Sequence, residues 1–378
     1  VALPDGRRAI LTIDPALQRT AEKTLTSAKA PVGAIVLTAV DGRILAIAGR
    51  RADSPKGGKA GSPDWSLTTT AWAPAASIFK IVTASALVEA GVDPNDKVCF
   101  HGGLRSVTAS NLTTASNDDR CEDLGFAVAY SQNAIIAKLA HEHLTGAKLD
   151  LAASRLGIDG ALSGFALTGV AGKVDVPDDD LEMARTAAGF RNSSLSPVGG
   201  AILVNAIANH GEVVTPRLVD AIIDANGVRT DLPGAAHRRA FADDVAIKVG
   251  HMMEQTCSRG TAAKAFRGDD GRLPGGARVA GKTGTLATDG PNEIEYSWFV
   301  GYAPADHPTV SIAVVLGNAS SWWMKGHTAA RMVLAKALAP HDTSVATADR
   351  DDGDGKVRQA DSDRGERRSR RHGRRHRR

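Results

Sequence analysis

Three short polar motifs follow one another along this chain, and together their side chains could carry out acyl transfer. The first is S-x-x-K, with Ser77 and Lys80; the second is S-x-N, with Ser131 and Asn133; the third is K-T-G-T at 282–285. Each motif alone is weak, because short polar patterns recur by chance. In this order they supply a serine nucleophile, two groups that can carry protons and a cationic anion site. The set indicates a serine acyltransferase that uses lysine as its base.

Lys80 can act on Ser77 only if both side chains lie on one face of a helix. Residues three apart meet this condition, and Pro74 favours a helix start close to Ser77. Residues 81–91 are mostly apolar and end at a glycine, so we expect a buried helix. Burial and the charge of Lys282 should both lower the pKa of Lys80, which favours the neutral amine that a general base requires. The alternative is an ordinary helix start that Ser77 caps.

The K-T-G-T motif is expected on a strand at or beside a sheet edge. Stretches typical of strands precede it at 278–281 and follow it at 296–302. Residues 276–283 also fit the phosphate-binding pattern G-x-x-x-x-G-K-T. That pattern requires a strand before its first glycine and a helix after its threonine, whereas turn residues precede it here, and Gly284 and 289–291 disfavour a helix after it. We therefore interpret the phosphate-site match as accidental.

Taken together, these motifs resemble those of the transpeptidase domain of penicillin-binding proteins. Stretches at 11–18, 33–48 and 298–304 are also similar to this family, so that the resemblance covers roughly residues 8–338. It implies an α+β fold of the β-lactamase and transpeptidase type, in which an antiparallel sheet built from N- and C-terminal segments packs against a helical subdomain. It also implies D-Ala-D-Ala transpeptidation of peptidoglycan stem peptides through a serine acyl-enzyme, inhibited by β-lactam antibiotics, with no cofactor and no metal.

The resemblance gives the catalytic roles to three residues. Ser77 would be acylated by the substrate, Lys80 would act as its base, and Ser131 would relay a proton to the leaving amine. Two departures from the family pattern are visible in the sequence. Ala75 and Ala76 stand where family members often carry Pro-Gly or Gly, and the middle residue of S-x-N is glutamine, unlike the S-D-N of class A β-lactamases.

Substrate binding would fall to the other motif residues. Asn133 would hold the side chain or an amide of the donor peptide, and Lys282 would supply positive potential. Thr283 and Thr285, on either side of Gly284, would bind the terminal carboxylate. The backbone N–H group of Thr285, together with that of the nucleophile, would form the oxyanion hole.

Three other functions remain open from the sequence. A D,D-carboxypeptidase would release the same acyl-enzyme to water. A β-lactamase needs a group that activates this water, and the chain has no Glu-x-x-Leu-Asn segment that would supply the class A carboxylate. A β-lactam sensor or binding domain without turnover would share S-x-x-K, but here every catalytic position is filled.

Charge is concentrated near the C-terminal end. The chain has 378 residues, is 43% hydrophobic and carries a net charge of +4, so it has ample apolar content for a core. Residues 349–378 hold 12 Lys or Arg and 7 Asp or Glu, a surplus of +5, and the rest is close to neutral. This end lacks apolar periodicity, so we expect it to be disordered. It would be either simply solvated or bound to anionic envelope polymers or lipid; no specific nucleic acid is expected.

The sequence divides into three parts. Residues 1–50 predict a strand, a helix and a hairpin that contribute to the sheet. By the family resemblance, residues 51–340 would form the transpeptidase domain. We expect this part to start with a mobile loop at 51–63 and to be dominated by helices from 74 to about 265. Residues 341–378 form the disordered basic tail.

The chain start and the cysteines bear on location. The sequence begins at Val1 without methionine and has no run of 18 apolar residues, so we expect an upstream signal or membrane anchor and an extracytoplasmic, envelope location. Cys99 and Cys121 enclose 21 residues ahead of S-x-N. In an oxidising compartment they can pair, which would stabilise the fold by ~3 kcal/mol; otherwise they are two free thiols. Cys257 is left over.

Overall fold

The computed structural model describes residues 1–52, 62–162, 168–267, 271–288, 294–318 and 322–340. Residues 1–339 form one compact unit. Most of the predicted mobile loop at 51–63, and the whole predicted tail at 341–378, lie outside the described residues. None of the described helices combines the length and the apolar character that crossing a bilayer requires.

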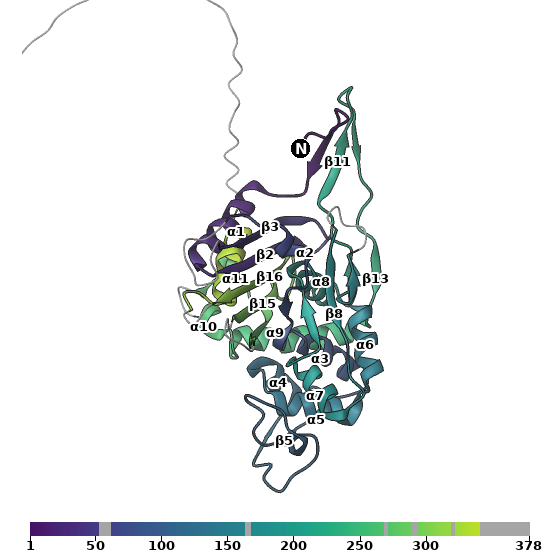
Figure 1. Cartoon of the computed structure of the whole chain (residues 1–378), viewed down its shortest axis with the longest axis vertical. Coiled ribbons are helices and arrows are strands. Elements are labelled where there is room, and N and C mark those ends of the chain that lie inside the picture. Colours follow the sequence, from purple (N-terminus) through teal and green to yellow (C-terminus); the bar gives the residue numbers. More distant parts are fainter. Residues whose placement is uncertain (53–61, 163–167, 268–270, 289–293, 319–321, 341–378) are drawn as a thin grey trace, which may run out of the picture. The chain divides into compact units, whose positions relative to one another are not determined.

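A five-stranded antiparallel sheet forms the centre of the described unit (Figure 1). Its order joins the two ends of the sequence, because the C-terminal strand β16 pairs with the N-terminal strand β2 with Val36 opposite Ala313. This confirms the predicted sheet built from N- and C-terminal segments. In order across the sheet, the strands are β14 (Ala280–Ala287), β15 (Glu295–Ala303), β16 (Val310–Asn318), β2 (Val32–Ala39) and β3 (Ile44–Arg51).

Helices cover both faces of this sheet, so its inner strands are buried on both sides. On one face, α1 (Pro15–Ala28) and α11 (Gly326–Ala337) pack against the sheet in a common apolar cluster. Helix α1 begins because the Asp14 carboxylate accepts hydrogen bonds from two N–H groups of its first turn and Pro15 stands at the first helical position. On the other face lies α8 (Pro197–Ala208), which is buried all round.

The helical subdomain contains the predicted apolar helix after Ser77. This helix, α3 (Lys80–Glu89), has all but its last residue buried. Its neighbours include α5 and α7, which later contribute to the site. The other helices of the described residues are α2 (Ser66–Thr69), α4 (Leu124–Tyr130), α5 (Asn133–His143), α6 (Gly146–Arg155), α7 (Asp180–Ala188), α9 (Asp243–Ser258) and α10 (Ala263–Phe266).

One sequence prediction about strands needs correction. The first strand, β1 (Arg8–Leu11), does not join the central sheet; it pairs with β11 (Val219–Ile223), which pairs with β12 (Arg229–Asp231) (Figure 1). Only Ala9 of β1 is fully buried, and such a strand suits a small exposed sheet better than a core covered on both faces. Helices dominate the region from 74 to about 265, as predicted, and short strands lie between them. They are β4 (Ala73–Pro74), β5 (Val98–Phe100), β6 (Arg120–Glu122), β7 (Gly160–Ala161), β8 (Val170–Val174), β9 (Ser193–Leu195), β10 (Glu212–Val214) and β13 (His237–Arg239).

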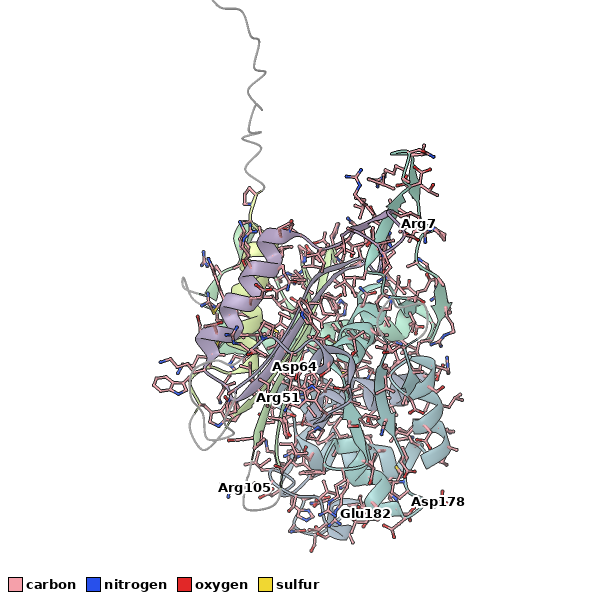
Figure 2. All side chains as sticks on the ribbon, turned by 45° about the horizontal axis from the view of Figure 1, so that its top comes forward. Arg7, Arg51, Asp64, Arg105, Asp178 and Glu182 are labelled. Carbon is pink, nitrogen blue, oxygen red and sulfur yellow. A yellow bond between two sulfur atoms is a disulfide. The ribbon has the colours of Figure 1, made fainter. Side chains whose placement is uncertain are left out.

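The chain leaves the sheet after β3 and is tied back to it by a charged pair. The Arg51 Nε atom lies 3.2 Å from Asp64 Oδ2, and the two side chains lie together in Figure 2. The Asp64 N–H also donates to the Gly49 carbonyl at 2.8 Å. A side chain at Gly49 would collide with the Asp64 carbonyl, so glycine permits this close return. The following chain leads through α2 and β4 to Ser77.

Candidate active site

Ser77 lies in a tight turn ahead of α3 and not in the α-helix itself. Residues Ala76–Ile78 form a 3-10 turn, and the α-helix begins at Lys80. Residues i and i+3 eclipse one another in 3-10 geometry, which brings the two side chains of the first motif face to face. The Lys80 Nζ atom lies 2.8 Å from Ser77 Oγ. The sequence prediction placed both residues in one helix; the contact is as expected, but the 3-10 turn was not foreseen.

The Lys80 amine is completely buried and has three hydrogen-bond partners. Its Nζ lies 2.8 Å from Ser77 Oγ, 2.7 Å from Asn133 Oδ1 and 2.6 Å from the Ala188 carbonyl oxygen. Burial lowers the pKa of Lys80 well below its usual value, and the charge of Lys282 lowers it further. A neutral amine has two N–H donors and one lone pair. Because Asn133 Oδ1 and the Ala188 carbonyl can only accept, the lone pair is left for the Ser77 hydroxyl proton.

The carbonyl of Ala188 reaches Lys80 because α7 ends there. The last carbonyls of a helix have no partner within the helix and attract N–H donors. Gly189 ends α7 in a left-handed conformation with φ of 86°. A side chain at Gly189 would collide with the Ala76 carbonyl. Glycine therefore lets the end of α7 touch the turn that carries the nucleophile.

Asn133 is oriented by the loop that follows β5. Its Nδ2 donates to the carbonyls of Gly103 at 2.8 Å and Leu104 at 3.1 Å. These two acceptors fix the amide, so Oδ1 faces Lys80. The side chain is buried, and its hydrogen bonds are made within the protein. Holding the donor peptide remains a prediction for Asn133, whereas positioning of the Lys80 amine is what its contacts indicate.

Ser131 lies at the junction of two helices. It ends α4 in a left-handed conformation, with φ of 59°, and α5 starts two residues later. Its Oγ accepts a hydrogen bond from Lys282 Nζ at 3.0 Å. The S-x-N motif therefore contacts both of the other motifs, because Asn133 is hydrogen-bonded to Lys80 and Ser131 to Lys282.

The K-T-G-T residues lie on the edge strand β14, as the sequence predicted. Lys282 is completely buried, donates also to the Thr283 carbonyl at 3.0 Å, and has its pKa lowered by burial to about 7. A Cβ on Gly284 would lie 3.2 Å from the Ile78 side chain, so the strand runs close beside the Ser77 turn. Since 280–287 is one continuous strand, it cannot form the loop that a phosphate-binding motif requires.

All three motifs open onto one cleft of about 940 Å³. Ser77, Ser131 and Asn133 line it from the helical side, and Thr283 and Thr285 from β14. Both residues of the predicted oxyanion hole, Ser77 and Thr285, therefore border the same space, and that role for their N–H groups remains a prediction. The cleft is also lined by Leu104, Arg105, Tyr130, Phe190, Thr261, Glu295, Ser297, Trp298, Lys325 and His327.

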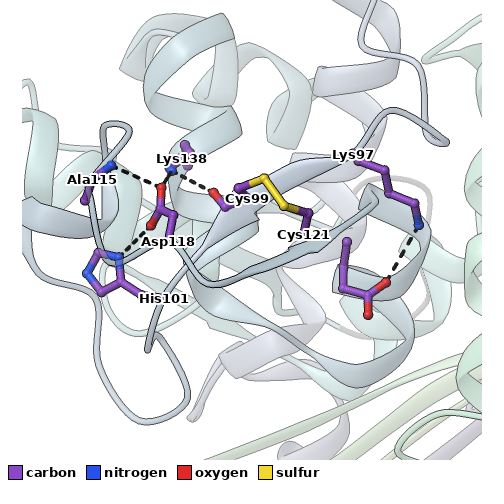
Figure 3. The surroundings of a disulfide bond; sticks show 8 residues. Lys97, Cys99, His101, Ala115, Asp118, Cys121 and Lys138 are labelled. Atoms are coloured by element: carbon purple, nitrogen blue, oxygen red, sulfur yellow. Dashed lines mark hydrogen bonds and ion pairs between the residues drawn. A yellow bond between two sulfur atoms is a disulfide. The ribbon is translucent and has the colours of Figure 1, made fainter.

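The structure joins Cys99 and Cys121 in a disulfide across β5 and β6 (Figure 3). A buried ion pair supports the same loop, because Lys138 Nζ lies 2.7 Å from Asp118 Oδ2 and donates to the Cys99 carbonyl at 2.8 Å. Hydrogen bonds from His101 and then Lys138 hold the pKa of Asp118 below its usual range. Beyond β5 this loop reaches the two carbonyls that orient Asn133. Cys257 is a buried free thiol.

Sequence reasoning missed several groups of the site. Ala188 and Gly189 carried no signal, because the acceptor is a backbone carbonyl that any residue can supply. Thr261 was given no role in the site from the sequence, and its Oγ1 lies 2.6 Å from Thr283 Oγ1. Trp298 was read as part of a strand, although its Nε1 also donates to the Pro74 carbonyl at 2.9 Å, just before the nucleophile turn.

Known proteins are similar to this chain in sequence. Peptidoglycan D,D-transpeptidase PbpA of Mycobacterium tuberculosis is 27% identical over 255 residues, which are 65% of this chain and 50% of PbpA. Stage V sporulation protein D of Bacillus subtilis is 27% identical over 363 residues, 88% of this chain and 53% of that protein. The chain thus spans about half the length of these relatives.

Solved structures support the fold assignment. Penicillin-binding protein A from M. tuberculosis, in its ceftriaxone acyl-enzyme complex, superposes with a TM-score of 0.72 at 22% identity over 89% of this chain and 81% of that one. The D,D-transpeptidase domain of a peptidoglycan glycosyltransferase from Eggerthella lenta gives 0.69 at 26% identity, over 88% and 83%. The family model of the penicillin binding protein transpeptidase domain matches residues 32–339. This chain belongs to the penicillin-binding protein transpeptidase family.

Proposed function

We propose that this chain is a serine D-Ala-D-Ala transpeptidase that cross-links peptidoglycan stem peptides and is acylated by β-lactams. The proposal rests mainly on the surroundings of the Lys80 amine. This buried amine contacts two acceptors, Asn133 Oδ1 and the Ala188 carbonyl oxygen, and lies 2.8 Å from Ser77 Oγ. A serine hydroxyl becomes a useful nucleophile when a base of this kind takes its proton. Membership of the family supports the substrate class.

The contacts support the following course of acylation. Lys80 takes the Ser77 proton as Oγ attacks the carbonyl of the penultimate D-Ala. The N–H groups of Ser77 and Thr285 stabilise the developing oxyanion, and Lys282 with the threonines of β14 holds the terminal carboxylate. The bond to the terminal D-Ala breaks, and its nitrogen receives a proton through Ser131, which Lys282 contacts.

Transfer is the reverse of this step with a new amine. The amine of a second stem peptide attacks the acyl carbon, a carbon–nitrogen bond forms, the bond to Ser77 Oγ breaks, and Oγ regains a proton. A β-lactam follows the first half only, because its leaving nitrogen stays attached to the acyl group. Among the described residues, Glu295 is the one acidic side chain that lines the cleft, and it lies at the outer end. No carboxylate of the described residues therefore stands beside Ser77 to activate water in the manner of class A β-lactamases.

Intact-mass measurement after brief incubation with benzylpenicillin tests this proposal. We expect one whole drug mass on the protein, located at Ser77 by peptide mapping and persisting for many minutes. Ser77→Ala is the control and should gain no mass. Rapid return to unmodified protein with accumulating hydrolysed drug would mean β-lactamase activity and would overturn the transferase proposal. Product analysis with a D-Ala-D-Ala peptide and an added amine separates transpeptidase from carboxypeptidase.

An extracytoplasmic envelope location belongs to the same proposal. The disulfide between Cys99 and Cys121 supports it, because such bonds persist in oxidising compartments. Thiol titration of the denatured, non-reduced protein should find one free cysteine, Cys257. A titre of three would remove this support. Adhesion of the basic tail to anionic polymer or lipid rests on charge alone and is tested by deleting 341–378 and measuring binding to anionic vesicles.

A further inference from the structure

The 101–106 segment, which follows β5, is held in place by side-chain amides. Strand β5 ends at Phe100, and no backbone–backbone hydrogen bond joins residues 101–106 to the rest of the described chain. Three consecutive carbonyls accept hydrogen bonds from amide side chains instead. These bonds run from Asn111 Nδ2 to His101 at 2.9 Å, from Gln132 Nε2 to Gly102 at 3.1 Å and from Asn133 Nδ2 to Gly103 at 2.8 Å.

Gln132, the middle residue of S-x-N, links this segment to the start of α5. Its Oε1 accepts a hydrogen bond from the Ala134 N–H at 2.8 Å and so caps the helix. Its Nε2 makes the one hydrogen bond that the Gly102 carbonyl receives within the described residues. The helix thus uses the oxygen of this amide, and the 101–106 segment uses its nitrogen.

The linked part of the segment is conformationally the most adaptable. Gly102 and Gly103 both have left-handed backbones, with φ of 56° and 71°, a conformation that glycine adopts without steric cost. A side chain at Gly103 would collide with Ala134, so the segment packs directly against the first turn of α5. Two adjacent glycines can also adopt many other conformations, and a hydrogen bond at Gly102 selects this one.

The orientation of Asn133 depends on where this segment lies. Its Nδ2 donates to the Gly103 and Leu104 carbonyls, and its Oδ1 lies 2.7 Å from Lys80 Nζ. If the two carbonyls moved, the amide could rotate and Oδ1 would leave the lysine. A neutral Lys80 would then have an N–H group without an acceptor, and this group could turn to Ser77 Oγ in place of the lone pair.

We propose that Gln132 is a positioning residue for the acylation of Ser77. By holding the Gly102 carbonyl it fixes the segment that orients Asn133, and through Asn133 it keeps the lone pair of Lys80 directed at the nucleophile. The inference rests on the proposed function, because it concerns the base of that reaction. It adds to that function a role for the middle position of S-x-N.

The test separates the two halves of the Gln132 amide. Gln132→Ser keeps a cap on α5, since serine is a preferred N-cap residue, but is too short to reach Gly102. Gln132→Glu keeps the length and the cap and loses the N–H donor. Gln132→Lys keeps a donor of similar reach and loses the cap. The second-order rate constant for acylation of the full chain by benzylpenicillin and the denaturant midpoint of unfolding are measured on the same preparations.

We expect Gln132→Ser and Gln132→Glu to acylate about tenfold more slowly than the parent, because the base is held less well. Their midpoints should stay close to that of the parent, because the cap is kept. One variant is neutral and the other is charged, so a shared loss of rate does not come from charge. Gln132→Lys should recover most of the lost rate although its midpoint falls, because it restores the donor and removes the cap.

Two further variants serve as controls. Gln18 also accepts from an N–H group and donates to a carbonyl, both of Ile47, at a position outside the cleft. Gln18→Ser should lower the midpoint and leave acylation within about twofold of the parent. In an Asn133→Ala background, Gln132→Ser should cause no further loss of rate, because the amide that it positions is absent.

The inference is overturned if Gln132→Ser and Gln132→Glu acylate within about twofold of the parent. It is also overturned if the rates of all variants, Gln18→Ser included, follow their midpoints, since Gln132 would then only stabilise the fold. An equal loss with and without Asn133 would mean that Gln132 does not act through this amide. Failure of the proposed function is a different result, in which benzylpenicillin leaves Ser77 of the parent unmodified.

Discussion

Each wall of the cleft contains a completely buried lysine, and the two lysines have different hydrogen-bond partners. On the helical wall, Lys80 meets groups from three separate segments, namely Ser77 in its turn, Asn133 on α5 and the last carbonyl of α7. On the strand wall, Lys282 meets the Ser131 hydroxyl and the carbonyl of its own neighbour, Thr283. Burial disfavours the charged form of both.

The partners decide the role of each lysine. Two fixed acceptors use both protons of a neutral Lys80 and leave its lone pair for Ser77. Lys282 has a pKa of about 7, so near neutrality a large fraction keeps its third proton and its charge for an anion in the cleft. A lysine side chain thus acts as a base on the helical wall, where Lys80 has more fixed acceptors, and as a cation on the strand wall, where Lys282 has fewer.

The largest effect should come from removing the base. Lys80→Ala should reduce acylation by benzylpenicillin nearly as far as Ser77→Ala does, because residues that act as one catalytic unit have grossly non-additive effects. The second-order acylation rate constant from stopped-flow or mass data measures this. If Lys80→Ala acylated nearly as well as the parent, Lys80 would be only a helix residue and the comparison of the walls would fail.

A smaller but still large effect is expected from Gly189→Ala. The new methyl group would meet the Ala76 carbonyl and push the Ser77 turn away from α7, and a misplacement of about 1 Å can cost a reaction about 100-fold. Gly227→Ala is the matched control, since φ is 84° there against 86° at Gly189 and a Cβ would meet nothing within 4 Å. Slow acylation in the first variant alone would show that the contact, and not the backbone angle, matters.

Much of this arrangement was predictable from the sequence. The mostly apolar run that ends at the glycine at position 91 predicted α3, and the strand pattern around Lys282 predicted a strand at or beside a sheet edge. The prediction was of one antiparallel sheet built from both ends of the chain, without saying which strands pair, because pairing between strands so distant in sequence leaves no local signal. The placement of β1 was wrong for the same reason.

The details that make Lys80 a base were not predictable. Its acceptors include the Ala188 carbonyl, and every residue has a carbonyl. The orientation of Asn133 depends on Gly103 and Leu104, about thirty positions away in sequence. Side-chain motifs indicate which chemistry is present, whereas backbone groups brought together by the fold set the protonation state.

Lys282→Ala should have a moderate effect that depends on pH. Loss of one charge-assisted contact costs roughly 1.5–3 kcal/mol, about ten- to a hundred-fold in rate, because Thr283 and Thr285 still hold the acyl group. The charge of Lys282 is present below its pKa of about 7 and is lost as pH rises through it. The parent's acylation rate constant should therefore fall on the alkaline side near pH 7, and Lys282→Ala should lack that fall. If the acylation rate constant fell in the same way above pH 7 in both proteins, the group that loses its charge would not be Lys282.

The smallest effect on chemistry should come from the disulfide, which lies behind the helical wall. Replacing Cys99 and Cys121 together by serine should lower the free energy of unfolding by about 3 kcal/mol, since the bond closes a loop of 22 residues in the unfolded chain. Acylation should change less than about threefold, because the ion pair of Lys138 with Asp118 still holds the loop that orients Asn133. Denaturant unfolding and acylation rates, measured on the same preparations, separate the two quantities. A loss of acylation beyond tenfold in protein that is still folded would mean that the bond itself holds Asn133 against Lys80, and the base would then depend on the redox state of the compartment.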